Sequence, residues 1–406
     1  MRHQDTPVLE NRSLPSRTEH PFEFYAATRL VVGAGTVGRI GDIARELGAT
    51  RALVASDPGI VRAGHTAASL ESFKAAGIAT AVFEGFGENP TSAQVEAGTA
   101  IARDFRPDLL VGLGGGSSMD CAKGINFLYS CGGRMADYRG RGTATGPMLP
   151  SIAVPTTAGT GSETQSFALI TDSATGRKMA CGDPRAAFRV AILDVELTLT
   201  QPARVAALTG VDAVTHAVES HVSRASTPAS RIFSREAWRL LTANLPRVFA
   251  DGRDLGARRA VQLGAAWAGL AIENAMLGAA HALANPLTAA HGVVHGQAVG
   301  LMLPHVVRFN AAACDHLYAE LAADLPGHPL DAFGAAGGRD SAAERIAGWL
   351  TVLLEQAKLA TTLGGLGLAT PDIESLATDA ATQWTGGYNP RPVTAAECGA
   401  LYEAAR

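Results

Sequence analysis

The chain has 406 residues, of which 47% are hydrophobic and 18% are charged, and it carries 45 glycines. This length and apolar content exclude a disordered protein and predict two to three domains at roughly 150 residues each. The net charge of −4, without any run of Lys or Arg, gives no reason to expect nucleic acid as a partner.

Cysteine use and the N-terminal residues bear on location. The five cysteines are scattered and include no C-x-x-C pair, which favours a reducing cytoplasm. Residues 1–22 are polar and lack the apolar stretch of a signal peptide, so we expect a flexible N-terminal arm. No apolar run approaches the ~20 residues of a membrane span, so we expect no membrane partner.

Between residues 23 and 200, short apolar or β-branched runs alternate with helical stretches such as 37–47 and 67–76. Strands are expected at residues 30–32, 52–55, 80–83, 108–113 and 152–154. Strands with helices between them predict an α/β domain whose parallel sheet is covered on both faces.

The amino-acid composition changes near residue 200, where we place a domain boundary. Alanine, leucine and arginine then dominate, with helical spacing over 234–245, 257–276 and 342–359. We therefore expect an all-helical domain from 201 to 406. Residues 327–338, rich in Gly, Ala and Pro, are expected to form an exposed loop.

Two glycine-rich loops compete as nucleotide sites. The first is a G-x-G-x-x-G pattern at residues 33–38, with Asp57 following at about the ~20-residue distance expected of a ribose-binding acid. The second, residues 114–123 (GGGSSMDCAK), follows the most apolar strand and opens a helix, so its backbone N–H groups suit a pyrophosphate. A third loop, 155–163 (PTTAGTGSE), offers hydroxyls for phosphate or ribose. Taken alone, the first loop is better explained as a tight turn that needs glycine, and the third is explained equally well in that way. The second loop favours a nucleotide site, because it lies between a strand and a helix.

Four side chains in the second half have the chemistry of a metal site. Asp212 and His216 are four residues apart and share one helix face, and we expect this helix to begin at Thr209 or Gly210. His281 and His295 lie further along, so a turn must bring them together. One carboxylate and three imidazoles suit Fe(II) or Zn(II). Spacing alone also leaves open a purely structural role for these histidines.

Several long motifs, in order, resemble those of the iron-containing (group III) alcohol dehydrogenase family over nearly the whole chain. The motifs are residues 114–123, 155–163, 209–219 (TGVDAVTHAVE), 295–296 with 303–305, and 389–392 (NPRP). The resemblance implies a Rossmann-like dinucleotide-binding domain followed by a helical metal-binding domain, with the active site between them. It also implies an enzyme that assembles as a homodimer or larger homo-oligomer, with the strand near Leu30 as one candidate contact.

The resemblance assigns roles to particular residues. It implies that Asp212, His216, His281 and His295 hold one Fe(II) or Zn(II) ion. It implies that the pyrophosphate lies on the second glycine-rich loop, that residues 33–38 only open the first helix, and that Asp57 faces the adenine ribose, which favours NAD over NADP. The cofactor-binding positions are Asp57, Gly114, Gly115, Gly116, Ser117, Asp120, Thr156, Thr157, Thr160 and Lys178.

Asn285 departs from the family pattern. Many members carry a second histidine four residues after the third metal ligand, beside the nicotinamide, and here that position is Asn285. Asn forms hydrogen bonds but takes up no proton near pH 7. Either the proton leaves by another route, with His291 as one candidate, or the substrate differs.

The leading hypothesis is an NAD-dependent, metal-dependent dehydrogenase that interconverts a small-molecule alcohol and its aldehyde or ketone, with hydride leaving an alkoxide held at the metal. One alternative is a reductase of the same fold for an acidic carbonyl compound, such as an oxoacid or a phosphonate aldehyde. Less favoured are a lyase similar to dehydroquinate synthase and a non-catalytic nucleotide-binding protein.

Overall fold

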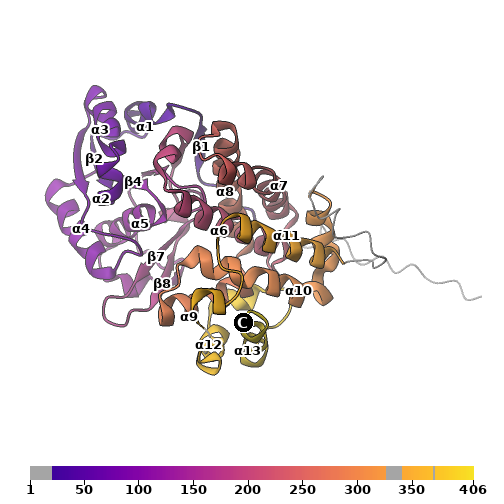
Figure 1. Ribbon diagram of the computed structural model, residues 1–406. Helices are drawn as coiled ribbons and strands as arrows, with labels where there is room; N and C mark the ends of the chain where they lie inside the picture. The colour runs from indigo at the N-terminus through magenta and orange to yellow at the C-terminus, as the bar shows by residue number, and fades with distance from the viewer. Residues whose placement is uncertain (1–20, 326–340, 369–370) are drawn as a thin grey trace, which may run out of the picture.

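The computed structural model describes residues 21–325, 341–368 and 371–406. The expected arm lies outside the described residues except for its last two, and the expected loop at 327–338 lies outside them entirely. Figure 1 shows a sheet covered by helices, in indigo to magenta, packed beside a helical body in rose to yellow. The predicted architecture, a parallel-sheet domain followed by an all-helical domain, is confirmed. The boundary near residue 200 stays a prediction.

The main sheet has six strands in the order β1-β9-β6-β4-β2-β3, and every pairing is parallel. Its strands are β1 (Arg29–Val32), β2 (Arg51–Ala55), β3 (Ala79–Phe83), β4 (Leu109–Gly114), β6 (Ser151–Pro155) and β9 (Val190–Leu193). All five expected strands are present, and the sixth, β9, is a short apolar run outside the expected strands. Residues of β4, β6 and β9 are buried throughout, as central strands of a parallel sheet require.

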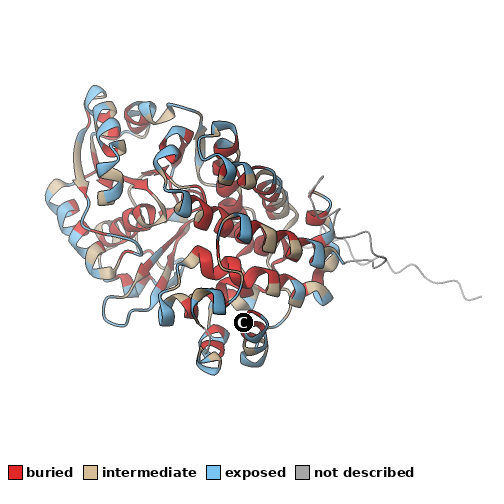
Figure 2. Cartoon of the chain, viewed as in Figure 1, coloured by how far each residue is buried: buried red, intermediate tan, exposed pale blue. Residues whose placement is uncertain are grey.

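Helices cover both faces of this sheet, and a hydrophobic cluster lies on each face. The helices of this half are α1 (Ile40–Glu46), α2 (Pro58–Arg62), α3 (His65–Ala75), α4 (Ser92–Phe105) and α5 (Gly116–Cys131), with 3-10 turns at Thr36–Arg39, Met135–Tyr138, Pro184–Ala186 and Val195–Thr200. A small second sheet is formed by β5 (Gly140–Arg141), β8 (Lys178–Gly182) and β7 (Phe167–Thr171). Figure 2 shows buried residues through the centre of both halves and exposed residues on the outer helices.

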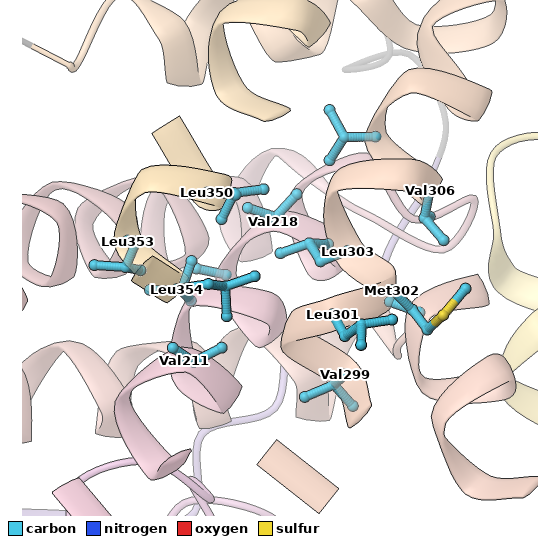
Figure 3. Packing of buried hydrophobic residues seen from close by; sticks show 14 of the residues in the cluster. Val211, Val218, Val299, Leu301, Met302, Leu303, Val306, Leu350, Leu353 and Leu354 are labelled. Carbon is cyan, nitrogen blue, oxygen red and sulfur yellow. The ribbon is translucent and has the colours of Figure 1, made fainter. Parts of the chain in front are cut away.

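The helical half is built around α6, whose residues 210–222 are all buried. Its helices are α6 (Ala203–Val222), α7 (Pro228–Ala250), α8 (Leu255–Ala275), α9 (Ala279–His291), α10 (His295–Ala322), α11 (Ala342–Gln356), α12 (Ile373–Ala381) and α13 (Ala395–Ala404), with 3-10 turns at Gly364–Leu366 and Trp384–Tyr388. Figure 3 shows side chains of α6, α10 and α11 packed together, among them Val211, Leu303 and Leu354. No helix of the described residues is both long enough and apolar enough to cross a bilayer.

The expected start of α6 at Thr209 or Gly210 was wrong, because the helix begins at Ala203. Thr209 does not cap it; the Thr209 hydroxyl donates to the carbonyl of Val205 at 2.9 Å, one turn back within the helix. Gly210 packs closely on α7, since a Cβ there would lie 2.4 Å from a Leu245 methyl group and would displace that side chain. Asp212 therefore lies in the middle of α6, surrounded by packed side chains.

Candidate functional site

Three adjacent strands have their carboxyl ends side by side, and an expected cofactor-binding residue lies at or just after the end of each strand. Asp57 follows β2, Gly114 ends β4, and Thr156 follows β6. The backbone N–H of Thr156 donates to the carbonyl of Gly114 at 2.9 Å, which joins two of these segments. The crevice outside the carboxyl ends of parallel strands is the usual ligand site of open α/β sheets.

The second glycine-rich loop turns tightly from β4 into α5. Gly114 has a φ of +145°, and a Cβ there would lie 2.3 Å from the Ser118 hydroxyl. Gly115 is the N-cap residue of α5, and no side chain there accepts a hydrogen bond from the first N–H groups of the helix. A Cβ on Gly116 would lie 2.9 Å from the Thr160 methyl group, so the hydroxyl-rich loop packs directly on this turn. The helix N-terminus thus keeps backbone donors for an anion.

The first glycine-rich loop has its donors already in use. The N–H groups of Gly35 and Val37 donate to the two carboxylate oxygens of Asp194, at 3.1 and 3.0 Å. The loop leads into a 3-10 turn and α1 at the edge of the sheet. Because the chain's own carboxylate takes the place that a phosphate needs, this loop makes a poor pyrophosphate site.

Asp57 has two contacts. Its Oδ1 accepts from the N–H groups of Gly59 and Ile60, which caps α2. Its Oδ2 lies 3.4 Å from the Ser118 hydroxyl, beside the second glycine-rich loop. One carboxylate oxygen is therefore held by the helix, and the other faces the loop.

The hydroxyl-rich loop lies between the sheet and the helical half. A Cβ on Gly159 would lie 2.2 Å from the carbonyl oxygen of Thr209 in α6, so loop and helix are in backbone contact. The Thr156 hydroxyl is buried and has no hydrogen-bond partner. Thr157 lies beside Gly115, at 3.5 Å from where a Cβ would stand.

Two further predicted cofactor residues, Asp120 and Lys178, lie near this loop. Asp120 accepts from the Ser162 hydroxyl at 2.8 Å. Lys178, at the start of β8, is within electrostatic range of both Asp120 and Asp212. Lys123, to which the sequence assigned no role, donates from its buried ammonium to Ser162 and to the Phe167 carbonyl. The position of Lys123 in the 114–123 motif was the sequence feature that could have indicated a role for it.

The three expected histidine ligands converge on one carboxylate oxygen of the fourth ligand, Asp212. The Nε2 atoms of His216, His281 and His295 lie 3.2, 3.5 and 3.8 Å from Oδ1 of Asp212. Asp212 and His216 come from α6, His281 from α9 and His295 from the first residue of α10. The rings of His216 and His281 stack with their centroids 5.0 Å apart.

These donors fit a divalent ion. Asp212 Oδ1 and His281 Nε2 are buried without a hydrogen-bond partner, although buried polar atoms are normally paired. Ligand atoms of Asp212, His216 and His281 lie within 4.8 Å of one another. A borderline cation bound by carboxylate oxygen and imidazole nitrogen would satisfy these atoms together.

Burial and neighbouring charges set the protonation of the group. Burial opposes charge on Asp212, but the three imidazoles outweigh burial and hold its pKa below the ordinary value. Burial lowers the pKa of His216 and of His295, which favours the neutral form that binds a metal. Burial acts in the same direction on His281, but the Asp212 and Glu219 carboxylates outweigh it and raise its pKa to about 9.

Asn285 lies one turn beyond His281 on α9, on the same helix face. Its Nδ2 donates to Oε1 of Gln383 at 3.0 Å. Gln383 directly precedes the 3-10 turn that begins at Trp384, whose ring packs against Phe167 with centroids 5.7 Å apart. The amide of Asn285 is thus held by the C-terminal segment, near the metal ligands.

Family models match both halves of the chain. Residues 27–195 match the model described as iron-containing alcohol dehydrogenase, and residues 206–406 match that of the C-terminal region of the same family. The NAD-dependent methanol dehydrogenase of Bacillus methanolicus is 34% identical over 91% of this chain and 96% of its own length.

Solved structures agree with the family models. A 1,3-propanediol oxidoreductase superimposes with a TM-score of 0.90 at 32% identity, covering 95% of this chain and 100% of that one. A sulfoacetaldehyde reductase from Bifidobacterium kashiwanohense, solved in complex with NAD+, gives 0.84 at 28% identity and covers 95% and 99% of the two chains. With matching models over both halves and full-length relatives of the same architecture, the chain belongs to the iron-containing alcohol dehydrogenase family.

Proposed function

We propose that this protein is an NAD-dependent, divalent-metal-dependent alcohol dehydrogenase that interconverts an alcohol and its aldehyde or ketone by hydride transfer. The observation that carries the proposal is the convergence of Asp212, His216, His281 and His295, with unpartnered buried atoms, in a chain whose glycine-rich loop opens α5. Dehydrogenation needs both a hydride acceptor and stabilisation of negative charge on oxygen.

The sheet half binds the cofactor in this proposal. The N–H groups of residues 114–117 hold the pyrophosphate at the start of α5. The Oδ2 atom of Asp57 accepts from a ribose hydroxyl and repels a 2′-phosphate, so NAD is used rather than NADP. Thr156, Thr157 and Thr160 contribute hydroxyls beside this loop, and Lys178 contributes a positive charge.

The helical half holds the metal. Asp212, His216, His281 and His295 bind Fe(II) or Zn(II), which supplies Lewis acidity toward an alcohol or carbonyl oxygen. Asp212 adds the single negative charge of the set. Asn285, one turn along α9 from His281, hydrogen-bonds the substrate through its carbonyl oxygen while Gln383 holds its amide nitrogen.

Activity with defined metals tests the proposal. The metal-free protein is loaded with Fe(II) or Zn(II), and NADH absorbance is followed with a panel of alcohols and aldehydes. We expect turnover in the native protein. In Asp212→Asn and His281→Ala we expect the turnover rate to fall by at least about 100-fold, because each variant loses a metal ligand. The control, His316→Ala, replaces an exposed histidine of α10 and should change the rate little. Absence of turnover with every metal and substrate would contradict the proposal.

A second candidate is a reductase of the same fold for an acidic carbonyl compound. The observation in its favour is Lys178, a cation within electrostatic range of Asp212 and His295. A positive charge beside the metal set would attract a substrate carboxylate, phosphonate or sulfonate. Reduction of acidic aldehydes far faster than oxidation of short alcohols supports this candidate, and equal rates on plain alcohols count against it.

We further propose that the protein acts in the cytoplasm as a homodimer or larger homo-oligomer. Support for assembly comes from β1, whose outer side is an edge of the main sheet with Val32 exposed. Sedimentation analysis at micromolar concentration tests the oligomer, and a monomer there would contradict it.

A further inference from the structure

Glu219 lies on the same face of α6 as Asp212 and His216, at positions related by helical spacing. Its side chain is 3% exposed, and it reaches from α6 to the first turn of α9. Oε2 accepts from Nδ1 of His281 at 2.6 Å, and Oε1 accepts from the backbone N–H of Ala280 at 2.6 Å. Both carboxylate oxygens are therefore used on α9.

The start of α9 has no cap of its own. Gly278 precedes the helix without a side-chain hydrogen bond, so the first N–H groups need partners from elsewhere. Glu219 supplies one, and Oδ1 of Asn389, in the 389–392 motif, lies 3.3 Å from the N–H of Ala279. A Cβ on Gly278 would lie 3.0 Å from Glu219 Oε1 and 3.1 Å from Asn389 Oδ1, so a larger residue would crowd both caps.

These contacts determine how the imidazole of His281 is presented. Because Nδ1 donates its hydrogen to Glu219, the lone pair of the neutral ring is on Nε2, the atom that faces Asp212 at 3.5 Å. A carboxylate behind a ligating histidine fixes both ring orientation and tautomer, and makes the imidazole a stronger donor. Here the same carboxylate also fixes the helix that carries the ring.

We propose that Glu219 is the positioning residue of this metal site, holding α9 and the His281 ring together so that Nε2 is presented to the ion. The inference rests on the proposed metal-dependent function. Glutamine at 219 has the same size but a single acceptor oxygen. It must therefore direct an N–H either at the N–H of Ala280 or at Nδ1 of His281, and in the second case the ring loses its fixed tautomer.

The test is metal affinity, measured on the whole protein without any turnover. Native protein, Glu219→Gln and Glu273→Gln compete with a chromophoric chelator for Zn(II), and the visible spectrum of the Co(II) forms is recorded. Glu273 is the matched control, because it is equally buried at 3% exposure and accepts from the Ser166 backbone and hydroxyl, but contacts no proposed ligand. We expect a loss of affinity of about 10–100-fold for Glu219→Gln and an altered Co(II) spectrum, with affinity retained in Glu273→Gln.

The outcomes separate this inference from the proposed function. A native protein that binds neither metal contradicts the proposed function itself. If the native protein binds metal and Glu219→Gln binds it equally well, or if Glu273→Gln loses as much, the positioning role is overturned. Should Glu219→Gln fail to fold, Glu219→Asp decides, because it keeps the charge but is one methylene too short to reach both donors; unchanged affinity there overturns the inference.

Discussion

Glu163 is a carboxyl group in the hydroxyl-rich loop that folding removes from water. Burial raises its pKa from the ordinary 4.5 to about 7, although a backbone hydrogen bond and the Lys123 ammonium oppose the shift. The folded protein thus holds this proton more tightly than the unfolded chain does. The stabilisation from Glu163 is complete below pH about 4.5 and is lost as pH rises through about 7.

Glu163→Gln removes this titration. Relative to the native protein, we expect the variant to gain stability between pH 4.5 and pH 7.5, by up to roughly 3 kcal/mol at ~1.4 kcal/mol per pKa unit. Denaturant unfolding of both proteins at the two pH values measures the difference. A stability difference that stays constant with pH would contradict the assignment.

Asp57 caps α2 and, in the proposed function, also places a negative charge beside the ribose; substitution can separate the two roles. Asp57→Asn keeps the Oδ1 acceptor for Gly59 and Ile60 but removes the charge that repels a 2′-phosphate. We expect the ratio of kcat/KM for NADP to that for NAD to rise on the order of tenfold, since one unit of close charge repulsion is lost. Unchanged thermal stability is the control, and an unchanged ratio would place the ribose elsewhere.

At the scale of elements, α10 is held against α6 by a backbone contact at Gly296, directly after His295. A Cβ on Gly296 would lie 2.2 Å from the Leu208 carbonyl oxygen, and neither backbone can yield without moving its helix. Gly296→Ala should therefore displace His295 from Asp212, weaken metal binding and cost about 1–3 kcal/mol of stability through overpacking. Metal titration and unfolding measure both effects. Gly146→Ala, where a Cβ meets open space, should change neither.

Helices and strands can be predicted from the sequence where neighbouring residues determine them, and less well where contacts distant in the chain do. Strands such as β4 are continuous apolar runs ended by glycine, so local composition predicts them. The start of α6 was misplaced because no side chain caps the helix where it follows Pro202, and because Thr209 bonds back into the helix instead of capping it.

The site follows the same rule. The pair Asp212 and His216 is visible in the sequence because a single helix turn joins them. His281 and His295 were placed with them by family resemblance, since spacing along the chain gives no distance across helices. Glu219 stood in a recognised motif without a role, because its partners lie 61 and 62 residues away on another helix.

At the scale of the whole molecule, the proposed metal joins three helices of the second half around one point. An ion that binds only the folded protein stabilises it by about 2.7 kcal/mol at a hundredfold excess over its Kd. We expect chelation to lower the Tm and Zn(II) to restore it, as differential scanning calorimetry would show. Asp212→Asn should abolish the difference; an equal rise in that variant would mean that the ion acts elsewhere.

The pairing of β1 with β9 places the first strand of the sheet beside the last, with Asp194 bonded to the backbone that follows β1. During synthesis, residues 29–32 leave the ribosome before the strand that pairs with them has been made. At ~5–20 residues per second, about 160 residues of further translation take on the order of ten seconds. The segment that begins the domain is therefore the last to join its sheet, and a nascent chain interrupted before residue 190 carries an unpaired apolar strand that invites association with other chains.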